Sequence, residues 1–172
     1  LEPEYVSISK DNKYAYVSIQ ENNALAIVNL QNNNLELKGL GFKDWSSLQL
    51  DASDKDGGVN FKSYPGLYGM YQPDTISSFS WKGDTNNDGQ YESLYGYGAR
   101  SFTIWDSNGL VVFDLGDDIA RITASVHGES FNNNEDENKG DSRSDDKGAE
   151  PEALTIGKID DRTFAFIGLE RM

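Results

Sequence analysis

The segment DTNNDGQYE has the spacing of the first half of a calcium-binding loop of the EF-hand type. Carboxylate and amide oxygens alternate along it, and a glycine follows that permits a sharp turn. The twelfth loop position holds a tyrosine where such loops place a bidentate glutamate, so the second half of the pattern fails. A plain strand-connecting turn explains the same residues, and both interpretations stay open. The candidate Ca²⁺ ligands are Asp84, Asn86, Asp88, Gln90 and Glu92.

A second acidic segment, DASDKDGG, brings Asp51, Asp54 and Asp56 close together in the chain. Carboxylates this close repel one another unless they are solvated, protonated or bridged by a cation. A solvated loop is one explanation of the segment. A metal-binding loop is the other, and it is our second candidate for a metal site.

Nucleophilic catalysis has little support in the sequence. The only histidine is His127, in ASVHGES, and no GxSxG or HExxH motif accompanies it. A Ser–His–Asp triad is defined by geometry and not by chain order, so sequence alone does not exclude one. The simpler expectation for His127 is a loop or a strand end.

Composition narrows the classes of partner. The 172 residues carry 29 acidic and 15 basic side chains, a formal net charge of −14. This charge opposes binding to nucleic acid and favours cations and basic partners. Cysteine is absent, which excludes disulfides and thiolate metal sites and leaves oxygen ligands. No run approaches the ~18 apolar residues of a membrane span.

The elements that must position these residues read as strands. Short β-branched and aromatic runs alternate with turns rich in Asn, Asp and Gly, which predicts an all-β fold. The strand-like runs are YVSIS, YAYVSIQ, ALAIVNL, DTISSFSW, SFTIWD, LVVFDL and FAFIGL. No window keeps the apolar period of a helix, so we expect at most a short helical turn near residues 44–50.

An internal repeat organises the chain. Residues 2–21 resemble residues 150–171, and both copies open with Glu-Pro-Glu and read as strand, turn and strand. The two copies lie far enough apart for about three or four units of ~40–50 residues, the length of common propeller blades. Ile8 aligns with Ile156 and, after a two-residue insertion, Ala15–Tyr16–Val17 aligns with Ala165–Phe166–Ile167.

The repeat predicts a single domain over residues 1–172 with a β-propeller-like fold of about three to four blades. A four-stranded blade cannot bury both of its faces alone, so blades must stack around an axis. A β-sandwich with two similar hairpins is the alternative. Residues 131–150 have almost no apolar side chains and are expected to form a polar, mobile loop, a solvated spacer more than a binding site.

Several long motifs resemble the choice-of-anchor I family of secreted bacterial β-propeller proteins, which are often labelled alkaline-phosphatase-like. The motifs, in chain order, are EPEYVSIS, AYVSIQENNALAIVNL, LGFKDWS, DASDKDGG, GMYQPDTI, YGARSFTIWD and DDKGAEPEALTIG. After Lys82 the chain departs from the family pattern, because a strand and an acid-and-Arg segment of the ANEGDAR type are missing before GARSF. The blades that follow GLER in the family are missing as well, so we expect an incomplete propeller.

The resemblance implies export from the cytoplasm, to the cell surface, the extracellular space or the periplasm. Its phosphatase label suggests a calcium-dependent phosphoesterase in the intact parent protein. If phosphate chemistry occurs, the physically reasonable route is Ca²⁺ held by Asp and Glu, which would activate a bound water while Arg100 or Lys147 helps to hold the anion. Arg100 could instead pair with an acidic turn. A chain lacking these parts is expected to be inactive alone.

The alternative function is a non-catalytic extracellular binding or surface module that uses propeller loops to bind a protein or glycan. An open set of blades also exposes an edge strand, which favours self-association or pairing with the missing blades.

Overall fold

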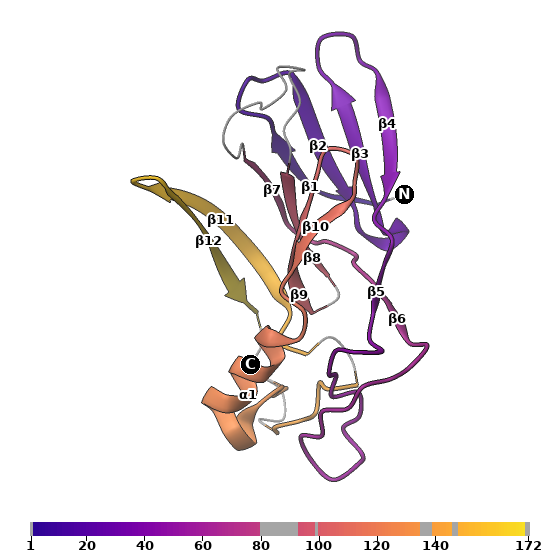
Figure 1. The fold of residues 1–172 in the computed structure, drawn as a ribbon, viewed down its shortest axis with the longest axis vertical. Helices are drawn as coiled ribbons and strands as arrows, with labels where there is room; N and C mark the ends of the chain where they lie inside the picture. The colour runs from indigo at the N-terminus through magenta and orange to yellow at the C-terminus, as the bar shows by residue number, and fades with distance from the viewer. Residues whose placement is uncertain (1, 80–92, 99, 135–138, 146–147, 171–172) are drawn as a thin grey trace.

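The chain forms an all-β fold, as its sequence predicts (Figure 1). Over the described residues it has twelve β-strands, one α-helix and two short 3₁₀-helices, η1 (Gln20–Asn22) and η2 (Gly128–Ser130). The computed structural model describes residues 2–79, 93–98, 100–134, 139–145 and 148–170.

The first sheet is an antiparallel meander of four strands in chain order. Asparagines with positive φ make its turns, at Asn12, Asn23 and Asn33, where a short amide side chain tolerates the left-handed conformation. The strands are β1 (Pro3–Ile8), β2 (Tyr14–Ile19), β3 (Ala24–Asn29) and β4 (Leu35–Gly39).

A second four-stranded meander follows, and a two-stranded ribbon of β5 (Phe42–Asp44) and β6 (Tyr68–Met70) lies between the two sheets in the chain. Its strands are β7 (Ile76–Phe79), β8 (Ser93–Gly98), β9 (Ser101–Trp105) and β10 (Val111–Asp114). Both meanders have the strand order of a propeller blade. Within the described part of the chain these sheets do not close into a ring.

The repeated motif forms the same hairpin twice. Ile8 pairs with Ala15 between β1 and β2, and the aligned Ile156 pairs with Ala165 between β11 (Pro151–Ile159) and β12 (Arg162–Leu169). Each hairpin has a register shift directly after its proline. The repeat is therefore a structural unit, down to the pairing of individual residues.

Successive sheets share their apolar faces. Tyr16 and Ile27 of the first sheet are buried in one cluster with Tyr71, Ile76 and Trp105, so the two four-stranded sheets pack against each other. Tyr71 and Trp105 meet edge to face, with ring centroids 5.1 Å apart, a favourable aromatic geometry.

The hairpin β11–β12 packs against Phe102 of the second sheet, in the same layered manner. β7 lies beside both β1 and β11, so the first strands of the three sheets are neighbours. Ser7 of β1 donates a side-chain hydrogen bond to Ser78 of β7 at 2.9 Å. A propeller places the first strands of its blades around a common axis in the same way.

The helix prediction was wrong in position. Residues 44–50 contain no helical turn, whereas α1 spans Asp118–His127. Only Ile119 and Thr123 of this helix are buried, and Ile122 and Val126 are exposed, so its apolar residues do not form one core-facing stripe. Ile119, Ile122 and Val126 nevertheless have the i, i+3, i+7 spacing of one helix face, so the sequence held a helical signal that was overlooked.

The polar segment at residues 131–150 is partly built into the fold. Phe131 is 1% exposed and contacts Phe61, and Asn132 and Ser144 are also buried. Over these residues the segment is packed against its neighbours and is not a solvated spacer. Its mobility stays a prediction.

Candidate functional site

Three segments that are distant in sequence contact one another through polar side chains and backbone carbonyls. The first is the acidic loop after Leu50, which two backbone hydrogen bonds between Leu50 and Lys62 close into a loop. The second is Arg100, at the start of β9, and the third is residues 131–150. We call Asp51, Arg100, Asn132, Asp141 and Ser144 the polar centre.

Arg100 joins the other two segments. Its guanidinium donates to the backbone carbonyl of Asp51 at 3.1 Å and to the carbonyl of Ser144 at 3.0 Å. Arg100 adopts a left-handed φ of 56°, which turns its side chain away from the ordinary strand direction. The planar guanidinium can bridge two carbonyls at once, which a lysine cannot do with the same geometry. These two hydrogen bonds give Arg100 a structural role.

Asp51 is a buried acid, with 2% of its surface exposed. Its Oδ2 accepts a hydrogen bond from the Asn60 backbone at 3.1 Å, whereas its buried Oδ1 has no partner among the described residues. Burial raises the pKa of the Asp51 carboxyl, and the nearby Asp141 carboxyl raises it further. The two acids therefore disfavour simultaneous ionisation.

A chain of side-chain hydrogen bonds completes the polar centre. Asn132 donates to Ser144 Oγ at 2.9 Å, and Ser144 donates to Asp141 Oδ1 at 2.8 Å. Asp51, Arg100 and Asn132 also line a cavity of about 10 Å³. This volume holds about one water molecule, and the unpartnered Oδ1 atoms of Asp51 and Asn132 would accept its hydrogen atoms.

The polar centre fits water better than a metal ion. Its oxygen atoms are of the type that Ca²⁺ binds, but the Arg100 guanidinium lies on the same cavity wall and repels a cation. The other two carboxylates of the predicted metal loop have separate partners. Asp54 pairs with Lys55 at 3.4 Å, and Asp56 pairs with Lys62 at 3.2 Å. The structure does not bring the three aspartates together.

The remaining predicted residues give less information. The first calcium candidates, Asp84, Asn86, Asp88, Gln90 and Glu92, lie outside the described residues, as does Lys147. His127 is the last residue of α1 and is half-buried. Its imidazole makes no hydrogen bond or ion pair with any residue that the structure describes.

Sequence reasoning missed an acidic cluster at the second Glu-Pro-Glu motif. Oxygen atoms of Glu150, Glu152 and Glu170 lie within 4.8 Å of one another. Glu150 forms an ion pair with Arg143. Burial raises the pKa of Glu152, and a hydrogen bond with Glu170 and the charge of Asp74 add to this effect. The repeated Glu-Pro-Glu motif supplies two of the three glutamates, but in the sequence it indicated the repeated hairpin and not an acidic cluster.

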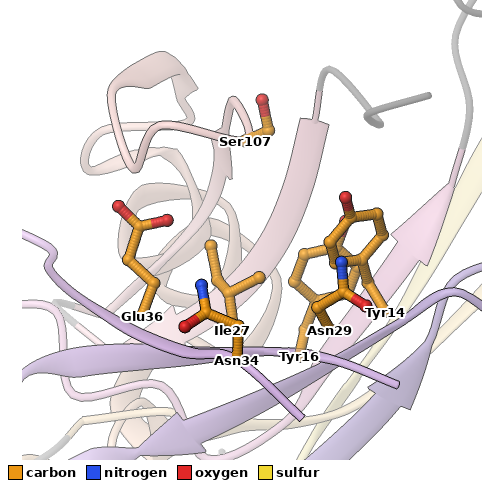
Figure 2. A pocket seen from close by; sticks show the side chains of 7 residues that line it. All are labelled: Tyr14, Tyr16, Ile27, Asn29, Asn34, Glu36 and Ser107. Atoms are coloured by element: carbon orange, nitrogen blue, oxygen red, sulfur yellow. The ribbon is translucent and has the colours of Figure 1, made fainter. Parts of the chain in front are cut away.

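Sequence reasoning also missed a cavity of about 210 Å³ between the two four-stranded sheets, shown in Figure 2. It lies where the inter-sheet core ends, since Tyr16 and Ile27 belong to both. Strand alternation puts its residues on one face: Tyr14 pairs with Asn29, and Ile27 pairs with Tyr16 and with Glu36. The lining residues are Tyr14, Tyr16, Ile27, Asn29, Asn34, Glu36 and Ser107.

Ser107 reaches the cavity from the opposite sheet, on the turn between β9 and β10 (Figure 2). Asp106 holds this turn by accepting backbone hydrogen bonds from Asn108 and Leu110, both at 2.9 Å. A Cβ atom at Gly109 of the same turn would lie 3.2 Å from Lys38 Cβ, so the turn packs closely on β4. We call this cavity with its seven lining residues the inter-sheet pocket.

Comparison with known families identifies the family of this chain. The model of the choice-of-anchor I domain matches the chain in two stretches, residues 1–86 and 82–172. The chain belongs to the choice-of-anchor I family. The two stretches meet near Lys82, where the sequence departs from the family pattern. Membership of this family points to a cell-surface or extracellular protein.

One curated relative aligns with half of this choice-of-anchor I chain. It is gigasin-3a of Magallana gigas, which is 32% identical over 90 residues, covering 49% of this chain and 32% of the relative. No solved structure matches the chain. Among the described residues, no helix is both long and apolar enough to cross a membrane.

Proposed function

We propose that this choice-of-anchor I chain is a non-catalytic module of the extracellular space or the cell surface, and that it works by binding. The observation that carries the proposal is that its candidate catalytic side chains are buried or bonded to the protein's own backbone. Arg100 bridges two backbone carbonyls, and Asp51 is buried beneath it. A catalytic arginine must instead present its guanidinium to the substrate.

A calcium-dependent phosphoesterase, the other function expected from the sequence, finds no support among the described residues. His127 has no partner there, and the cavity beside Arg100 is too small for a phosphate ester. The formal charge of −14 would also repel an anionic ester in the absence of a bound cation.

A phosphatase assay tests the non-catalytic part of the proposal. We expect the purified chain to hydrolyse p-nitrophenyl phosphate and bis(p-nitrophenyl) phosphate no faster than buffer, with or without CaCl₂. Calcium-stimulated turnover by the purified chain would contradict it. Retention of the labelled chain on an array of glycans and peptides tests the binding part, and an array with no retained spot would contradict that part.

Calcium binding is a separate proposal, based on the spacing from Asp84 to Glu92. Isothermal titration calorimetry with CaCl₂ tests it. We expect the paired substitution Asp84→Asn and Asp88→Asn to abolish the heat of binding, and Asp51→Asn to leave it unchanged. A titration of the unmodified chain without any heat of binding would remove calcium from the account.

A further inference from the structure

The inter-sheet pocket combines an aromatic wall with polar groups that face it from three strands and two turns. Tyr14 and Tyr16 stand two residues apart on β2, with ring centroids 6.5 Å apart and planes inclined by 28°. Tyr16 is 2% exposed and belongs to the core, whereas Tyr14 is half-buried. The buried ring thus supports a second ring that solvent can reach.

We propose that the inter-sheet pocket binds one residue of a neutral sugar. A sugar ring has a face of C–H groups, which suits the electron-rich face of a tyrosine, and a rim of hydroxyl groups that both donate and accept hydrogen bonds. This inference rests on the proposed function, because it names the ligand class of the binding module.

The polar groups of the pocket supply both kinds of hydrogen-bonding partner. The Asn34 amide donates and accepts, the Glu36 carboxylate accepts, and the Ser107 hydroxyl does both. The side chains of Asn34 and Ser107 hydrogen-bond to no other described residue, so their polar atoms can bond a ligand. A packing gap between two sheets would more commonly be lined by apolar side chains.

Part of the pocket is fixed in place before any ligand arrives. Asn29 Oδ1 accepts the backbone N–H groups of Gln31 and Asn32, at 2.9 and 3.3 Å, which orients its NH₂ group. The turn that carries Ser107 is held by Asp106 in the same manner. A preorganised pocket loses less conformational entropy on binding.

The volume and the charge of the inter-sheet pocket limit the class of ligand that it can bind. The volume of about 210 Å³ is below the range of about 300–1,000 Å³ for drug-sized ligands, which favours a single sugar residue. No lysine or arginine lines the pocket. Lys38 lies nearby but pairs with Glu36 at 2.5 Å. Because the Lys38 ammonium is already paired with Glu36, the pocket offers no further cation to bind the carboxylate of an anionic sugar. We therefore expect neutral sugars to bind better.

Nitrogen–proton correlation NMR on the complete chain tests the proposal. The probes are glucose, galactose, mannose and N-acetylglucosamine, each titrated to about 50 mM, with glucuronate as the anionic comparison. We expect at least one neutral sugar to shift the amide signals of residues 14, 34 and 107, with a dissociation constant of roughly 1–10 mM. Glucuronate should bind at least several-fold more weakly.

Variants separate this pocket from the rest of the surface. Tyr14→Ala should weaken binding about 10-fold or more, through loss of the aromatic face. Asn34→Ala, at an exposed turn residue, should weaken it several-fold without a change in folding. The matched control is Tyr68→Ala, which removes a tyrosine that is 60% exposed on β6 and should leave binding unchanged.

Flat titrations with all four neutral sugars would overturn the proposal, as would binding that Asn34→Ala and Tyr14→Ala leave intact. Glucuronate binding as tight as that of the neutral sugars would overturn the charge argument. These outcomes differ from failure of the proposed function. Retention on the glycan and peptide array without turnover, together with flat sugar titrations, would keep the binding module and reject only this pocket.

Discussion

Asp51 is a buried carboxyl whose surroundings disfavour its ionised form. It is 2% exposed and lies close to Asp141, and burial raises its pKa. A carboxyl with a raised pKa holds its proton more tightly in the folded chain than in the unfolded chain. Stability therefore falls as the pH rises from the ordinary value of 3.8 through the folded pKa, and the penalty stays constant above it.

The substitution Asp51→Asn should remove that penalty. The amide keeps an oxygen that can accept the Asn60 backbone N–H, but it cannot ionise. We expect the variant to be more stable than the unmodified chain at pH 7, with a difference that shrinks as the pH falls through the folded pKa of Asp51 toward 3.8. Urea unfolding across this pH range measures it. A variant that is less stable at pH 7 would show that Asp51 is ionised and well paired.

Arg100 offers a test of structural bridging at the residue scale. Arg100→Lys keeps the charge but cannot bridge the carbonyls of Asp51 and Ser144 together, so the free energy of unfolding should fall by about 1–3 kcal/mol. Arg121→Lys is the matched control, because Arg121 is exposed on α1 and its ion pairs with Asp117 and Asp118 are long, at 4.0 Å each. It should change stability by less than ~0.5 kcal/mol. Equal losses in the two variants would refute the bridge.

Among the elements, the turn between β9 and β10 of the second sheet packs closely on β4 of the first sheet. Gly109 has a φ of 79°, and its missing Cβ lets the turn approach Lys38. Gly66 has nearly the same φ, 82°, but no atom within 4 Å of its hypothetical Cβ. The two glycines share the conformational requirement and differ in packing.

Alanine substitutions at these glycines should separate the cost of the left-handed backbone conformation from the cost of lost packing space. Gly66→Ala should cost about 1–2 kcal/mol for the left-handed conformation alone. Gly109→Ala should cost more, since its Cβ would lie 3.2 Å from Lys38 Cβ and would push the turn away from β4. Urea unfolding of both variants gives the comparison. A smaller cost at Gly109 than at Gly66 would contradict the close packing of this turn.

Which elements form could largely be predicted from the sequence. The seven strand-like runs all contain strands of the structure, and the repeat gives the same hairpin pairing in both copies. The helix over Asp118–His127 was missed although Ile119, Ile122 and Val126 have helical spacing, because the pattern lasts only about two turns. The strand β8 was also not identified, since SLYGYG has two glycines and no β-branched residue.

At the scale of the whole molecule, the edge strand β10 leaves apolar side chains at the surface. Val111, Val112 and Phe113 are 44%, 60% and 46% exposed. An exposed apolar edge strand favours pairing with another chain.

Self-association is therefore expected for the purified chain. Sedimentation velocity at increasing protein concentration should show a dimer, and Val112→Lys should shift the distribution toward monomer because a charge blocks edge pairing. The control is Val59→Lys, at a residue 42% exposed in the loop after the acidic segment. A monomer at every concentration would contradict self-association through β10.

The sequence by itself determined the all-β class, the repeated hairpin and the candidate residues, because strand alternation and turn chemistry are local properties of the chain. Only the tertiary structure decided how those residues are used. Arg100 came to rest on the carbonyls of Asp51 and Ser144, and the three aspartates of the acidic loop separated to different partners. The inter-sheet pocket depends on how two sheets pack. Such contacts are set by long-range packing, which no local pattern encodes.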